Sequence, residues 1–126
     1  MTDGVLRVVQ LNAGSLLEPG WAERRHEVAA WLERLDPDIV CLQEIWESDT
    51  SGNTAGWLVE HAGPGRWHWR FAGGPLGPPF TTQAGVVFGS AILSRWPVDD
   101  DHHWHLPLAP RPEAVVAHMP WELLHV

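Results

Sequence analysis

The sequence predicts a single α/β domain that opens with a strand–helix–strand unit. Residues 5–11, VLRVVQL, are rich in β-branched and aliphatic side chains, as strands are. Residues 38–44, DIVCLQE, form a second apolar run of strand length, and a segment with helical periodicity separates the two. With 126 residues the chain has the length of one domain.

The segment between the two runs, WAERRHEVAAWLERL at 21–35, is predicted to be an amphipathic helix. Val28, Leu32 and Leu35 recur at the spacing of one helix face, and charged residues occupy the opposite side. Asp36-Pro37 ends the helix, because the residue before a proline resists the α conformation. A strand–helix–strand crossover makes its two strands parallel within one sheet.

Asn12 and Glu44 are the first candidate site residues, because parallel strands end at the same edge of a sheet. In open α/β sheets, ligands bind beyond the carboxyl ends of the strands. Mg²⁺ is usually held by one or two carboxylates together with phosphate oxygens. An asparagine amide can orient a phosphate oxygen without adding negative charge. Taken alone, the pair fits a loop-capping asparagine and a solvated glutamate equally well.

The rest of the chain predicts short elements joined by loops. A polar loop is expected at 47–56, a short helix at 57–63, a strand at 66–72 and a Gly/Pro-rich loop at 73–80. Two short strands turning near Gly89-Ser90 are expected within 84–98, a loop at 99–112 and a hairpin at 113–126. No internal repeat or linker indicates a domain boundary.

Composition excludes several classes of protein. The net charge of −8 supplies no basic field for passive nucleic-acid binding, although a bound cation could neutralise phosphate at a local site. The single cysteine, Cys41, cannot form an internal disulfide and is expected to be an inert buried thiol. Neither a signal peptide nor a membrane-spanning segment is recognisable, so a soluble cytoplasmic protein is expected.

Other polar side chains are weaker candidates. His102, His103 and His105 adjoin Asp99–Asp101, and such mixtures can bind transition metals, but a polar surface loop is the favoured interpretation. Arg95 could bind a phosphate oxygen of the substrate, although an arginine that closes a strand end is favoured. The other residues considered have structural interpretations: Ser94, His26, His118 and His125 as polar side chains, Trp31 and Trp46 as core, and Trp67 and Trp69 as packing between layers.

Three sequence blocks, LRVVQLNA, RRHEVAAWLERLDPDIVCLQEIW and GSAILSRWPV, follow one another within residues 6–98. In order and spacing they resemble the N-terminal half of the endonuclease/exonuclease/phosphatase superfamily. The resemblance implies a four-layer α/β/β/α sandwich, of which this chain would be the N-terminal half. It also implies a Mg²⁺- or Mn²⁺-dependent phosphoesterase acting on nucleic acid, phospholipid or inositol phosphate. Glu44 would be the metal ligand, and Asn12 would lie near metal and phosphate.

The sequence also departs from that family. A Thr-His-Leu strand end, a Gly-Asp-x-Asn loop and a terminal Ser-Asp-His, which supply the general base and charge-stabilising groups, are not found. We therefore expect residues 1–126 to be a single truncated or split domain that is inactive in isolation. The alternative is a non-catalytic fragment that associates with a partner through an exposed sheet edge, or that has no function.

Overall fold

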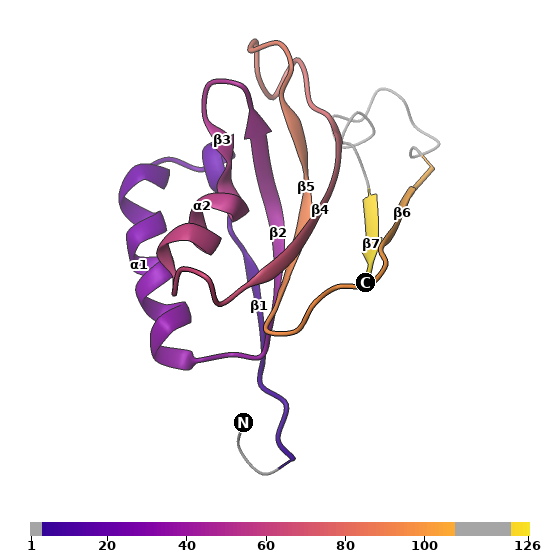
Figure 1. Cartoon of the computed structure of the whole chain (residues 1–126). Coiled ribbons are helices and arrows are strands. Elements are labelled where there is room, and N and C mark those ends of the chain that lie inside the picture. The colour runs from indigo at the N-terminus through magenta and orange to yellow at the C-terminus, as the bar shows by residue number, and fades with distance from the viewer. Residues whose placement is uncertain (1–3, 108–121) are drawn as a thin grey trace.

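A computed structural model describes residues 4–107 and 122–126 of the chain. Its elements lie in three layers: two helices, a mixed sheet and a two-stranded sheet (Figure 1). The elements are β1 (Val8–Asn12), a 3-10 turn (Ser15–Leu17), α1 (Trp21–Leu35), β2 (Ile39–Ser48), β3 (Gly52–Asn53), α2 (Thr54–His61), β4 (His68–Pro75), β5 (Val87–Ser94), β6 (His102–His105) and β7 (Glu122–His125).

The predicted strand–helix–strand unit is confirmed. β1 and β2 are parallel neighbours, with Val8 opposite Ile39 and Asn12 opposite Gln43. α1 covers the predicted residues and ends at Leu35, and the next residue, Asp36, caps it by donating its N–H to the Leu32 carbonyl. Asp36 is left-handed (φ 50°), so the chain turns sharply before Pro37 and returns to the sheet.

The main sheet has the strand order β1-β2-β5-β4, with β3 paired to the end of β2. β5 is antiparallel to both β2 and β4. Figure 1 shows α1 and α2 on one face of this sheet and the β6–β7 pair beside its opposite face. The sheet is therefore packed between helices and a second layer of strands.

The expected turn near Gly89-Ser90 was wrong, because β5 runs through both residues as one continuous strand. Gly89 is buried between the two neighbouring strands, opposite Ile45 of β2 and Gly73 of β4. A Cβ atom at Gly89 would lie 1.9 Å from the carbonyl oxygen of Ala72. The glycine is there for close approach of backbone rather than for a turn.

Several further boundaries differ from those predicted, and β4 extends to Pro75, into the loop predicted at 73–80. β2 continues four residues past Glu44, and the predicted loop at 47–56 also contains β3 and the start of α2. The predicted loop at 99–112 contains β6, which pairs with β7. Most of the predicted 113–126 hairpin lies outside the described residues. Short segments rich in histidine and glycine show little apolar periodicity. Whether they form strands depends on the strands with which they pair.

The largest apolar cluster fills the space between the helices and the main sheet. It joins Ala29 and Leu32 of α1 and Leu58 of α2 to apolar residues of β2 and β5, with Trp67 buried and Trp69 packed against it. Trp46 is also buried, as predicted, in a smaller cluster with Phe88.

Trp31 was expected in the core but is 45% exposed. Its indole N–H donates to Glu27 Oε1 at 3.1 Å, and the Arg34 guanidinium lies over its ring at 4.5 Å. The apolar stripe of α1 is narrow, so a residue next to Leu32 projects along the surface instead of into the sheet.

Asp36 ties the end of α1 to two other segments. Its carboxylate forms ion pairs with Arg66 and with Arg95, the latter at 2.7 Å. The Arg95 hydrogen bond, supported by the charges of Arg66 and Arg95, lowers the pKa of Asp36 and outweighs the opposing effect of desolvation.

Replacing Asp36 by asparagine should lower stability at neutral pH and have no effect in strong acid. A lowered pKa in the folded state stabilises the fold above the unfolded value of 3.8, and this contribution is lost as pH falls through the folded value. Asparagine tolerates the left-handed backbone, so the comparison isolates the charge. Urea unfolding midpoints of both chains should converge toward pH 2 and at high salt. A pH-independent difference would contradict this origin.

Candidate active site

The candidate site is built around an irregularity in β2. Leu42 pairs with Ala91 of β5 and Ile45 pairs with Gly89, so two residues of β2, Gln43 and Glu44, lie opposite the single residue Ser90. This is a β-bulge, which inserts one extra residue into one strand. Glu44 adopts a left-handed conformation with φ 56°. Such a conformation costs an L-residue about 1–2 kcal/mol.

The bulge changes which face of the sheet each β2 side chain occupies. Leu42 and Ile45 are three residues apart, so on a regular strand they would point to opposite faces. Both are fully buried in the same cluster beneath the helices. Trp46 consequently joins the separate cluster around Phe88. Burial on both sides thus requires the alternation to reset between Leu42 and Ile45, and Glu44 lies where it resets.

The sequence had suggested that Glu44 lies at the tip of a strand. It lies instead inside β2, which continues to Ser48. Its side chain is half-buried, and its carboxylate makes no hydrogen bond or ion pair with the described residues. Its strand neighbour Glu47, by contrast, accepts a hydrogen bond from Asn53 Nδ2 at 2.9 Å. The Glu44 carboxylate is therefore available to a ligand.

Asn12 is brought next to this bulge by the register of β1 on β2. It lies opposite Gln43, and the following residue, Ala13, donates its N–H to the Gln43 carbonyl at 2.9 Å. The side chain is exposed, and its Oδ1 accepts the Gly14 N–H at 2.9 Å. This short turn fixes the amide orientation and leaves the Nδ2 group without a hydrogen-bond partner among the described residues.

The loop that follows Asn12 is held by Arg24 of α1. The Arg24 guanidinium and Nε donate to four loop carbonyls, those of Ala13, Ser15, Glu18 and Pro19, at 2.9–3.2 Å. Gly14 has φ 64°, and a Cβ atom there would lie 2.6 Å from Glu18 Cγ. The sequence alone gave no signal for this role of Arg24, because its partners are backbone atoms.

Arg95 lies at the other end of β2. β5 is antiparallel to β2, so Ser94 pairs with Ile39 and the Arg95 N–H donates to the Asp38 carbonyl at 3.1 Å. The Arg95 guanidinium pairs with Asp36 and Asp38. The structure thus brings Asn12 and Glu44 together and keeps Arg95 apart from them, with the structural role that the sequence favoured.

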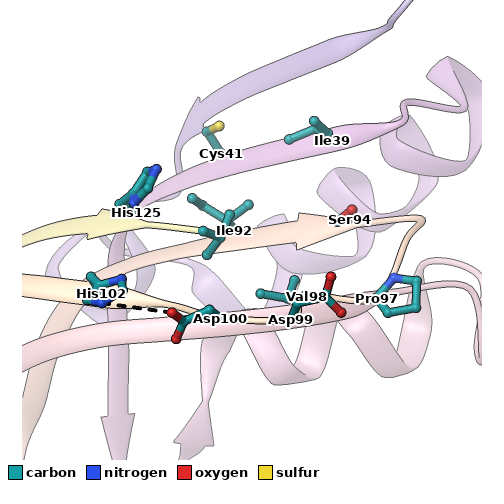
Figure 2. Close-up of a pocket in the computed structure, with 11 residues that line it drawn as sticks. Ile39, Cys41, Ile92, Ser94, Pro97, Val98, Asp99, Asp100, His102 and His125 are labelled. Atoms are coloured by element: carbon teal, nitrogen blue, oxygen red, sulfur yellow. Dashed lines mark ion pairs between the residues drawn. The ribbon is translucent and has the colours of Figure 1, made fainter.

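A cleft of about 550 Å³ lies away from Glu44. Figure 2 shows Ile39, Cys41 and Ile92 from the main sheet facing His102 and His125 from the small sheet. Cys41 is half-buried there rather than fully enclosed. His102 Nε2 lies 3.9 Å from Asp100 Oδ2, an ion pair when the histidine is protonated. The lining is mostly apolar, as expected of space between two sheets.

Within the described residues, no three His, Cys, Asp or Glu side chains are grouped closely enough to hold a metal ion. The site around Glu44 therefore offers one carboxylate and one amide. This donor set suits Mg²⁺, which keeps several waters and takes one or two carboxylates, rather than Zn²⁺, which takes three or four protein ligands.

No helix of the described part is long and apolar enough to span a bilayer.

These features define an α/β protein with a candidate acidic site on its two parallel strands, β1 and β2. The Endonuclease/Exonuclease/phosphatase family model matches residues 9–124, and the chain belongs to this family. No curated protein matches the chain.

Two solved structures are similar to this chain in fold. An endonuclease/exonuclease/phosphatase family protein from Leptotrichia buccalis C-1013-b has a TM-score of 0.67 at 14% identity, covering 80% of this chain and 42% of that one. An endonuclease/exonuclease/phosphatase from Beutenbergia cavernae DSM 12333 has a TM-score of 0.68 at 24% identity, covering 81% and 29%. The chain spans less than half the length of either.

Proposed function

We propose that this chain carries the metal-binding part of a Mg²⁺-dependent phosphoesterase site, with Glu44 as the metal ligand. The observation that supports it most is a half-buried carboxylate without a protein partner, held in a left-handed bulge. A structural glutamate gains nothing from that conformation, whereas strained backbone is commonly kept where function requires it. Mn²⁺ would serve as an alternative ion, since it prefers the same oxygen ligands.

Asn12 would bind the phosphate ester beside the metal. Its Oδ1 accepts the Gly14 N–H and keeps a second lone pair, and its Nδ2 group can donate to a phosphate oxygen. The turn holds the amide in one orientation, so binding phosphate would not require it to be ordered first. The amide thus adds affinity for a phosphate oxygen without repelling it.

The bound ion would polarise the phosphoryl oxygen and neutralise charge that develops on it and on the leaving group. The chain's own contribution is then to present the Glu44 carboxylate and to orient the ester through Asn12. Within residues 4–107 and 122–126, the site gathers no general base that would activate water. We infer that a complete reaction requires groups supplied by further polypeptide, and that substrates are phosphate esters.

Two measurements test the proposal. Mn²⁺ binding tests the metal role of Glu44, and hydrolysis of bis(p-nitrophenyl) phosphate tests whether further catalytic groups are needed. The purified chain should bind Mn²⁺, measured by calorimetry or by water-proton relaxation. It should not hydrolyse the ester with Mg²⁺ or Mn²⁺ above the EDTA control. Absence of Mn²⁺ binding by a folded chain would refute the metal role. Metal-dependent turnover would instead show that these residues form a complete site.

Association through a sheet edge is the second candidate function. In the described part of the chain β1 pairs only with β2. Its first residue, Val8, is 53% exposed, and Val5 and Leu6 before it are 64% and 57% exposed. An apolar edge strand of this kind recruits further strands. Sedimentation of the same preparation tests self-association through this edge. A monomer at all concentrations, with cooperative unfolding, would exclude it.

A further inference from the structure

The two halves of the candidate site are joined by a buried chain of hydrogen bonds. The Trp46 N–H, two residues after Glu44, donates to Thr54 Oγ1 at 3.0 Å. Thr54 Oγ1 lies 2.8 Å from Ser15 Oγ, with either hydroxyl as donor. Ser15 belongs to the loop that follows Asn12. The chain of contacts therefore runs from the bulge, through the first residue of α2, to the Asn12 loop.

These hydroxyl groups are shielded from water. Ser15 is 0% exposed and Thr54 is 2% exposed. A buried N–H that loses its acceptor has no water to replace it, so the Trp46 amide depends on the Thr54 hydroxyl. Apolar burial alone could not choose this backbone orientation, because apolar contacts have no direction.

Two hydrogen bonds bracket Glu44. On its N-terminal side the Gln43 carbonyl accepts the Ala13 N–H at 2.9 Å. On its C-terminal side the Trp46 N–H is held by Thr54. The first bond fixes the Gln43–Glu44 peptide group and the second fixes the Ile45–Trp46 peptide group, so the backbone torsions of Glu44 and Ile45 must connect them, and Glu44 takes the left-handed φ. Removal of one bond would let β2 relax toward a regular strand and turn the carboxylate.

A second contact anchors Thr54 itself. Asn53 caps α2 by accepting the N–H groups of Ala55 and Gly56 at 2.9 and 3.0 Å, and its Nδ2 group donates to Glu47 Oε2. β3 also pairs Asn53 with Glu47. The capped first turn of α2 thus holds Thr54 in place, so its hydroxyl is positioned against β2.

We propose that Thr54 is a positioning residue for Glu44: its hydroxyl, supported by Ser15, holds the β2 bulge in the conformation that presents the carboxylate to a divalent cation. This rests on the proposed metal role of Glu44 and extends it to a residue that touches neither metal nor substrate. The effect on affinity follows the fraction of molecules that keep the bulge, because the apparent dissociation constant rises as that fraction falls.

The test compares Thr54→Val, which removes the hydroxyl at nearly constant volume, with Thr54→Ser, which keeps it. NMR of the labelled chain follows the amide and Cα signals of Glu44, which report its left-handed backbone, and Mn²⁺ titration follows paramagnetic broadening. Thr54→Val should shift the Glu44 signals and raise the Mn²⁺ dissociation constant about five- to tenfold, as expected if roughly 10–20% of molecules keep the bulge. Thr54→Ser should restore both to within about twofold.

Thr82→Val is the matched control, since Thr82 is exposed and outside this chain of contacts. Thr82→Val should change neither the Glu44 signals nor the Mn²⁺ dissociation constant. If Thr54→Val does not fold, Ser15→Gly provides the second variant, because glycine accepts the φ of 43° at Ser15 while the hydroxyl is lost. It should move the Glu44 signals in the same direction by a smaller amount.

The outcomes separate this inference from the proposed function. A folded Thr54→Val chain with unchanged Glu44 signals would overturn the positioning role, as would an unchanged signal in Ser15→Gly if the first variant is unfolded. If Mn²⁺ does not broaden the NMR signals around Glu44 in the wild-type chain, the metal role of Glu44 is refuted. The backbone signals would still decide whether Thr54 holds the bulge.

Discussion

Replacing Glu44 by glutamine is expected to abolish divalent-cation binding at the site while leaving the fold intact. The change removes the one carboxylate that the described residues place at the bulge but keeps the size of the side chain. Replacing a residue outside the ligand shell already costs roughly 10–100-fold in metal affinity, so loss of the ligand should exceed about 100-fold. Stability should change by less than about 0.5 kcal/mol, because the carboxylate has no partner among the described residues.

The matched control for this variant is Glu47→Gln on the same strand. Glu47 has the same charge and lies three residues away, but its carboxylate is engaged by Asn53. Its replacement should leave Mn²⁺ affinity within about twofold, because glutamine keeps an oxygen that can accept the Asn53 hydrogen bond and Glu47 is not a proposed ligand. Calorimetric titration of both variants with Mn²⁺ makes the comparison. Equal affinities of the Glu44→Gln variant and the wild type would remove Glu44 from the site.

Replacing Gly89 by alanine is expected to be the most destabilising substitution of a glycine. Its Cβ atom would meet the Ala72 carbonyl oxygen at 1.9 Å and Gly73 Cα at 2.5 Å. Both atoms belong to the backbone of β4, so no side chain can move aside and β4 and β5 must separate. Overpacking usually costs about 1–3 kcal/mol, and an immovable backbone places this variant at or above the upper value.

Urea unfolding measures the loss, with Gly77→Ala as the control. Gly77 has no atom within 4 Å of the position of a Cβ, so alanine there should not destabilise the chain. Gly89→Ala should lower the unfolding midpoint strongly, and its closeness to Ile45 should also disturb the bulge. Equal midpoints for the two variants would show that β4 and β5 are not paired through Gly89.

The first third of the fold was readable from sequence because its signals are local and agree with one another. The periodicity of residues 21–35 defined α1 to the residue, and the crossover rule gave parallel β1 and β2. The pairing of Asn12 next to Glu44 followed from those two facts. Later elements lack such agreement: β6 is a four-residue strand of HHWH, whose sequence carries no alternation of apolar residues.

The sequence by itself determined the βαβ unit, the acidic residue on its second strand and the family to which they belong. Only the tertiary structure decided the bulge, the left-handed Glu44, and the contacts of Thr54, Ser15 and Arg24 that surround it. The reason is physical. Helical periodicity and strand composition act between near neighbours along the chain. A bulge is instead selected by the register of β5 and by hydrogen bonds from segments far away in sequence.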